Sequence, residues 1–103
     1  MSNETWKKEN THKYTIRVLN LFYGIIIRMY NEQGGQHNVP HIHAEYQGNE
    51  VVIDLDGNVL AGNIKPDKLR MVQVWMDIHR EDLEANWKLL SAGEQFFRID
   101  PLR

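Results

Sequence analysis

The chain changes its hydrophobic period at Lys65-Pro66-Asp67, and this change limits the folds open to it. Before this point, short segments alternate apolar and polar residues or are rich in β-branched residues, which is typical of strands. After it, apolar residues recur every three or four positions from Leu69 to Leu90, which is typical of an amphipathic helix. Pro66 suits the first turn of a helix, and Asp67 favours the positive end of the helix dipole. The sequence therefore predicts strands first and helix second.

Turn-forming residues divide the first part of the chain into segments of strand length. Gln47-Gly48-Asn49 is predicted to form a tight turn, and Asp56-Gly57 is a strong hairpin signal because both residue types tolerate positive φ. Four segments between such signals are predicted to form an antiparallel sheet, at residues 25–30, 41–46, 50–55 and 58–62. Two further short strands are expected at residues 14–19 and 95–99.

The second part of the chain is predicted to be mainly helical over residues 66–91. The pattern fits one helix of roughly 25 residues, or two helices with a kink near His79. Gly93 suits the position just after a helix end. The predicted fold class is therefore α+β: an antiparallel β-meander of four to five strands with one long C-terminal helix, kinked or straight, packed on one face.

Alternation along each predicted strand divides the side chains between two faces of the sheet. The face toward the helix is expected to carry Ile25, Ile27, Met29, Ile42, Ala44, Tyr46, Val51, Ile53 and Leu55. The opposite face is expected to be a polar surface that carries Arg28, Tyr30, His41, His43, Glu45, Val52 and Asp54. On the helix, Trp75, His79 and Trp87 lie on or beside the apolar stripe, where roles in the core are expected.

The segment Pro40-His41-Ile42-His43-Ala44-Glu45-Tyr46 holds the main candidate site. On a strand the two histidines and the glutamate project from one face and can serve one metal ion or one ligand. Zinc sites typically need three or four protein ligands, so two imidazoles alone do not form one. The candidate ligands for a divalent ion, zinc or nickel, are His41, His43, Glu45 and Asp54, with His37 as a further candidate. A hydrogen-bonded structural pair and a contact to a partner protein are the other readings of the two histidines.

Composition limits the class of protein. A chain of 103 residues with 42% hydrophobic and 25% charged residues is typical of one globular domain. The absence of cysteine excludes disulfides, thiol catalysis and cysteine-ligated zinc, and the net charge of −2 gives no reason to expect nucleic acid. Residues 1–13 are predicted to form a polar, flexible tail, and residues 14–103 the single domain. With no signal-peptide pattern and no membrane span, a cytoplasmic location is expected.

Several segments together resemble a known family. They are Phe22-Tyr23-Gly24-Ile25-Ile26-Ile27-Arg28-Met29-Tyr30, the Pro-His-x-His-Ala-Glu-Tyr segment that begins at Pro40, then Trp75, His79-Arg80-Glu81, Leu83 and Asn86-Trp87. Over roughly residues 21 to 102 the chain resembles a small bacterial family catalogued only as a domain of unknown function, number 4160. The resemblance implies a small cytosolic protein whose gene often neighbours that of another small uncharacterised domain, as in toxin–antitoxin pairs. It implies no activity and no catalytic residue.

Two classes of function stay open. The preferred hypothesis is an interaction or regulatory module that forms a homo-oligomer or binds a small protein from a neighbouring gene, with Ile26, Tyr30 and Val52 as contact residues. The alternative is a hydrolase or ribonuclease-type toxin that uses His41 or His43 as general acid or base, with or without a metal. No nucleophile constellation, phosphate-binding loop or organic cofactor motif supports the enzyme.

Overall fold

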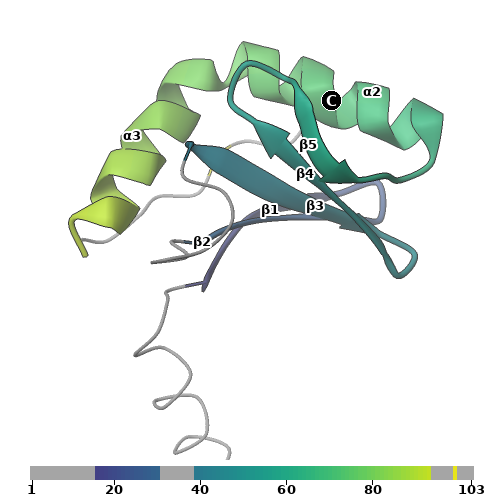
Figure 1. Cartoon of the computed structure of the whole chain (residues 1–103), viewed down its shortest axis with the longest axis horizontal. Helices are drawn as coiled ribbons and strands as arrows, with labels where there is room; N and C mark the ends of the chain where they lie inside the picture. The colour runs from purple at the N-terminus through teal and green to yellow at the C-terminus, as the bar shows by residue number, and fades with distance from the viewer. Residues whose placement is uncertain (1–15, 31–38, 94–98, 100–103) are drawn as a thin grey trace, which may run out of the picture.

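The computed structural model describes residues 16–30, 39–93 and 99. Within them the chain forms an antiparallel sheet of order β1-β2-β3-β4-β5, followed by two helices (Figure 1). The elements are β1 (Ile16–Phe22), β2 (Ile25–Tyr30), β3 (His41–Tyr46), β4 (Asn49–Asp54), β5 (Val59–Gly62), α2 (Pro66–Ile78) and α3 (Arg80–Ser91). The predicted α+β class and antiparallel meander are confirmed. The predicted tail and nearly all of the predicted strand 95–99 lie outside the described residues.

Two tight turns join the first four strands in two pairs. Tyr23 and Gly24 join β1 to β2 with φ values of 51° and 77°, and Gln47 and Gly48 join β3 to β4 with 51° and 83°. Two central residues at positive φ are the signature of a type I′ turn, whose twist matches that of the flanking strands. Each turn therefore holds its two strands directly against each other.

The helical part of the chain is divided at His79, which has φ −110° and ψ 25°. The prediction of one long helix is wrong in this respect, and the alternative of two helices with a break near His79 is the one found. The backbone N–H of His79 still donates to the carbonyl oxygen of Trp75, and Leu83 N–H donates to that of His79. The break therefore redirects the chain while these backbone groups remain hydrogen-bonded.

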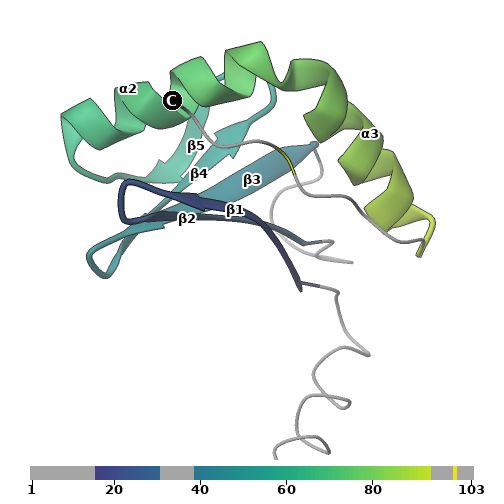
Figure 2. The same ribbon diagram turned by 180° about the vertical axis from the view of Figure 1, so that it is seen from behind.

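The break places the two helices on different parts of the sheet. In both views α2 lies across one face, whereas α3 turns down past the end at which β3 begins (Figures 1 and 2). The helix begins at Pro66, as predicted, and Gly93 follows α3 with φ 74° and donates its N–H to the carbonyl oxygen of Leu90. No helix in the described part of the chain is long and apolar enough to cross a membrane.

The core lies between the sheet and the helices, on the face that alternation predicted. Trp75 is fully buried and its ring lies 5.7 Å from that of Phe22. Around it the buried apolar residues are Ile25, Ile27, Met29, Ile42, Ala44, Val51, Ile53, Leu55, Ile64, Val72, Met76, Leu83, Leu90 and Ile99. Tyr46, which was predicted on this face, is half-buried against the cluster.

Shortening a core side chain should destabilise the domain. Ile27→Ala and Leu83→Ala each remove buried methyl groups from a packed site, so we expect losses of about 2–5 kcal/mol in the free energy of unfolding. Urea denaturation followed by circular dichroism measures this loss. The matched control is Ile78→Ala on exposed helix surface, which should change stability by less than about 0.5 kcal/mol. Equal effects at Ile78 and Leu83 would contradict the assigned helix faces.

Gly62 should resist substitution more than Gly57 does. Both have positive φ, but only at Gly62 would an added Cβ collide with a backbone atom, the carbonyl oxygen of Glu50. Gly57→Ala therefore tests backbone strain alone, about 1 kcal/mol, whereas Gly62→Ala adds a clash between β5 and β4. The same denaturation experiment should rank Gly62→Ala as clearly the more destabilising, and a reversed order would contradict the close approach of the two strands.

Candidate functional site

The outer face of the sheet, opposite α2, holds the candidate site. In the pairing of β3 with β4, His41 lies opposite Asp54, His43 opposite Val52, and Glu45 opposite Glu50. Directly opposed residues of an antiparallel pair share a face. Ile42 and Ala44, the alternate residues of β3, are buried in the core on the other side. The register therefore gathers side chains from β2, β3 and β4 on the outer face.

His41 and His43 are buried, with 0% and 5% of their surface exposed. The expectation of an open polar surface at these positions is therefore wrong. Val52, between β3 and β5 on the same face, is also buried. Because a buried polar group without a partner is costly, the two imidazoles need specific contacts.

Tyr30 and Glu50 are two of the residues that contact His43. The Tyr30 ring stacks on the imidazole with 4.1 Å between centroids and 15° between planes, and the Tyr30 hydroxyl lies 3.1 Å from Nδ1. The Glu50 Oε2 atom lies 3.4 Å from the same nitrogen. Both groups therefore meet the same ring nitrogen of His43.

His41 is held by the backbone and by an aromatic ring from α3. Its Nδ1 donates a hydrogen bond of 2.7 Å to the carbonyl oxygen of Val39, which can only accept. In the neutral imidazole the proton is therefore on Nδ1 and Nε2 is an acceptor. The Trp87 ring lies 5.3 Å away and the His43 ring 5.1 Å away. Tyr30, His41, His43, Glu50 and Trp87 are named below the histidine cluster.

An ion pair lies beside the histidine cluster on the same face. Arg28 Nη1 donates to Glu45 Oε1 at 2.6 Å, and both side chains are about one-third exposed. This pair joins β2 to β3, whose strands are neighbours in the sheet. Glu45, predicted as a metal ligand, thus has an arginine as its contact.

Asp54, another predicted ligand, is engaged in the turn between β4 and β5. Its carboxylate accepts hydrogen bonds from the backbone N–H groups of Asp56 and Asn58 and from the Asn58 amide. Slight burial acts to raise the pKa of Asp54, but the hydrogen bonds from Asn58, Asp56 and Gly57 together lower the pKa below its usual value. The carboxylate therefore stabilises a turn, although its residue is paired with His41.

The predicted metal ligands are not gathered around one point. Among residues 16–30, 39–93 and 99, no group of three or more His, Asp or Glu side chains is arranged to hold a metal ion. The third candidate histidine, His37, lies outside that part of the chain. The described donors by themselves do not fit zinc or nickel, and metal binding stays a prediction.

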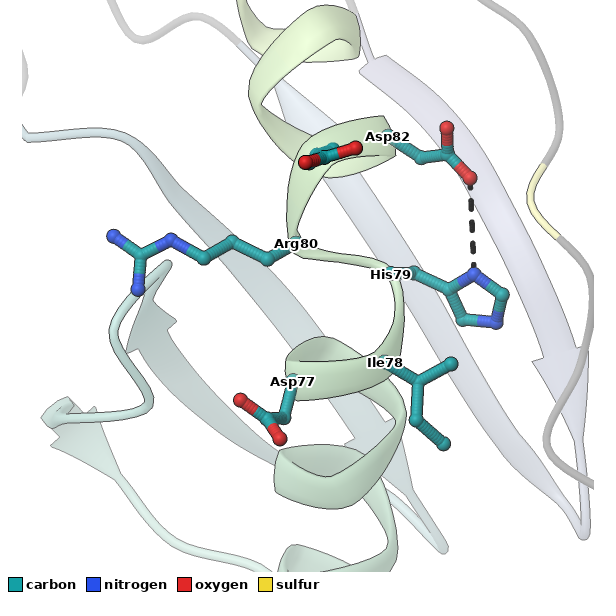
Figure 3. A pocket seen from close by; sticks show the side chains of 6 residues that line it. Asp77, Ile78, His79, Arg80 and Asp82 are labelled. Atoms are coloured by element: carbon teal, nitrogen blue, oxygen red, sulfur yellow. Dashed lines mark ion pairs between the residues drawn. The ribbon is translucent and has the colours of Figure 1, made fainter.

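His79 is at the junction of the two helices rather than deep in the core. Its ring lies 5.6 Å from that of Trp75, and its Nδ1 lies 3.7 Å from Asp82 Oδ2 (Figure 3). Figure 3 also shows that Arg80 points to the other side, where it forms an ion pair with Asp56. A hollow of about 330 Å³ at this junction is lined by Asp77, Ile78, His79, Arg80, Glu81 and Asp82.

A second hollow lies close to the histidine cluster. It has a volume of about 320 Å³ and is lined by Pro40, Leu55, Glu84, Trp87 and Lys88. Trp87 therefore contacts His41 and also borders this hollow. The hollow is thus bordered both by the residue before β3 and by residues of α3.

Two members of the histidine cluster were missed as site residues in the sequence. Glu50, Val52 and Asp54 are alternate residues of one strand and therefore share a face. Strand periodicity could have placed Glu50 on the face of the two histidines. Trp87 was expected in the core or at its edge, and its contact with His41 depends on the direction that α3 takes after His79. No local pattern indicates that direction.

A family model described as "Domain of unknown function (DUF4160)" matches residues 24–88, which is more than half of the chain. The chain belongs to this family. The matched residues run from the β1–β2 turn to the last part of α3 and include the whole histidine cluster, whereas β1 lies outside them. No curated protein and no solved structure is similar enough to this family member to count as a match.

The turn at Asp54 should make stability depend on acid pH. A carboxyl group whose folded pKa is below its unfolded value stabilises the fold above that unfolded value, and this stabilisation is lost as the pH falls through the folded pKa. We expect the free energy of unfolding of the parent to fall below about pH 4, and to fall less in Asp54→Asn, whose amide does not titrate there. Urea denaturation between about pH 2 and about pH 7 tests this, and equal pH dependence in both proteins would contradict it.

Proposed function

We propose that this chain is a cytoplasmic interaction or regulatory module that binds a small protein partner through the outer face of its sheet, as one component of a toxin–antitoxin-like pair. The observation that supports the proposal is the set of side chains on that face that are not fully buried. Half-buried Ile26 and Tyr30 lie on the same strand as Arg28, which is paired with Glu45. We call these four residues the outer patch.

The outer patch has the composition of a protein-binding surface. Tyrosine and arginine are enriched at protein interfaces and frequently contribute most to binding. An ion pair on the patch offers both signs of charge to a partner, which favours specificity. The mixture of apolar and paired charged groups is therefore better suited to a protein than to a nucleic acid.

The contacts beneath the patch support binding by a rigid surface. Tyr30 is stacked on buried His43 and hydrogen-bonded to it, so its ring has little freedom to lose when a partner binds. Val52, the third predicted contact residue, is buried in the single chain. In this proposal, Ile26 and Tyr30 are therefore the predicted residues that contact the partner protein.

The same contacts favour binding over catalysis. A general base must reach the proton it removes, and the two histidines are buried. A histidine-dependent hydrolase or ribonuclease-type toxin is therefore the less favoured proposal.

The test is co-expression with the protein encoded by the neighbouring gene, followed by size-exclusion chromatography with light scattering. We expect a complex with the parent and its loss with Tyr30→Glu, which places a charge in the contact. Tyr30→Phe keeps the ring and should keep the complex.

The matched control is Tyr23→Glu, because Tyr23 is an exposed tyrosine in the β1–β2 turn and is not part of the outer patch. It should bind as the parent does. Ile26→Lys, on the patch itself, should weaken binding even if Tyr30→Glu proves to be unstable in thermal melting. A complex that survives both patch substitutions, or no complex with the parent, would refute the proposal.

A further inference from the structure

We infer that the free edge of β5 is a self-association site at which two copies of this chain pair antiparallel and join their sheets. β5 is the last strand in the sheet order and is hydrogen-bonded to β4 alone within the described sheet. All four of its residues are exposed, including Val59 at 45% and Leu60 at 37%. This surface is separate from the outer patch, so the inference goes beyond the proposed function.

The β5 edge lacks the residues that usually prevent such pairing. Natural edge strands are protected by lysine or other charges, by proline, by inward-pointing charged residues, by bulges or by short length. β5 has four residues and one irregularity in its pairing with β4, but it has none of these protecting residue types. Between Asn58 and Ile64 this chain has Val59, Leu60, Ala61, Gly62 and Asn63, with no charge and no proline. An exposed apolar edge whose N–H and C=O groups are unprotected is complementary to another extended strand.

The strand is held closely against β4. The two strands share a register from Val51 opposite Gly62 to Ile53 opposite Val59, with one irregularity between Val52 and Ile53. A Cβ at Gly62 would collide with the Glu50 carbonyl oxygen, which shows how near the backbones lie at this end. At the other end, Gln73 Nε2 donates to the carbonyl oxygen of Gly57, so α2 holds the turn in place. The edge is therefore presented as a formed strand.

The charges that flank β5 favour a second copy as the occupant. Asp56, which is paired with Arg80, lies before the strand, and Lys65, which lies beside Asp67, follows it. Both side chains are still about 60% exposed, so each can also meet a charge on a second copy. An antiparallel two-fold pair brings the start of one β5 beside the end of the other, and so brings Asp56 of each copy toward Lys65 of its partner. A parallel pair would bring like charges together. Two-fold pairing also uses one self-complementary surface on both copies.

The experiment is analytical ultracentrifugation of the full chain over a range of concentrations. We expect the parent to be a dimer that dissociates on dilution. Leu60→Lys introduces a charge at the edge and should raise the dissociation constant at least about tenfold. The matched control is Ile78→Lys, which adds the same charge at an exposed apolar residue on α2 and should leave the dimer unchanged.

A charge exchange tests the antiparallel arrangement. Lys65→Asp alone should weaken the dimer, and the double variant Asp56→Lys/Lys65→Asp should restore it, because each copy again offers opposite charges at the two ends. A double variant as weak as the single one would overturn the two-fold arrangement.

The outcomes separate this site from the outer patch. Tyr30→Glu should leave the dimer intact, and Leu60→Lys should leave binding of the neighbouring gene's protein intact. A parent that stays monomeric at every concentration, a Leu60→Lys variant that dimerises as the parent does, or dissociation by Ile78→Lys would overturn the inference. Loss of the neighbour's protein on Leu60→Lys, with a monomeric parent, would assign the edge to that partner instead.

Discussion

The burial of β3 on both faces is the constraint on which the rest of the structure depends. On one face Ile42 and Ala44 are fully buried in the core, and on the other His41 and His43 are almost as deeply buried. An apolar side chain needs only packing partners, but a buried imidazole also needs hydrogen-bond partners. Tyr30 and Glu50 on the neighbouring strands and the Val39 carbonyl just before β3 supply polar contacts, and Trp87 of α3 adds a ring contact. The polar side of β3 is therefore as closely specified as its apolar side.

Because of the break at His79, the helices contact residues on both faces of β3. A straight continuation of α2 would keep all of the helix stripe on the core face. Because the chain turns at His79, α2 covers the core while α3 passes the end of β3 and brings Trp87 to His41 (Figures 1 and 2). Leu83 and Leu90 on the same helix are buried in the core. The residues of α3 thus link the core to the histidine cluster.

The proposal of binding rests on which polar groups are already paired within the chain. His43 meets Tyr30 and Glu50, Arg28 meets Glu45, and Asp54 binds its own turn. These contacts hold the side chains of the outer face in place, which supports the proposal of binding. β5 is different, because its four residues are exposed and none of them is charged.

The sequence by itself determined the local features. The change of period at Pro66 predicted the order of strands and helices, and alternation predicted that Ile42 and His43 would lie on opposite faces, because these properties repeat along a few neighbouring residues. Only the tertiary structure decided the depth of burial of His43, the choice of Glu50 as its neighbour, the contact of Trp87 with His41, and the exposure of β5. Each of these depends on strand register, on the direction of α3 after His79, or on which strand is last in the sheet. Such relations join residues far apart in the chain. Local periodicity gives the face on which a side chain such as Glu50 lies, but not which residue it meets across the sheet.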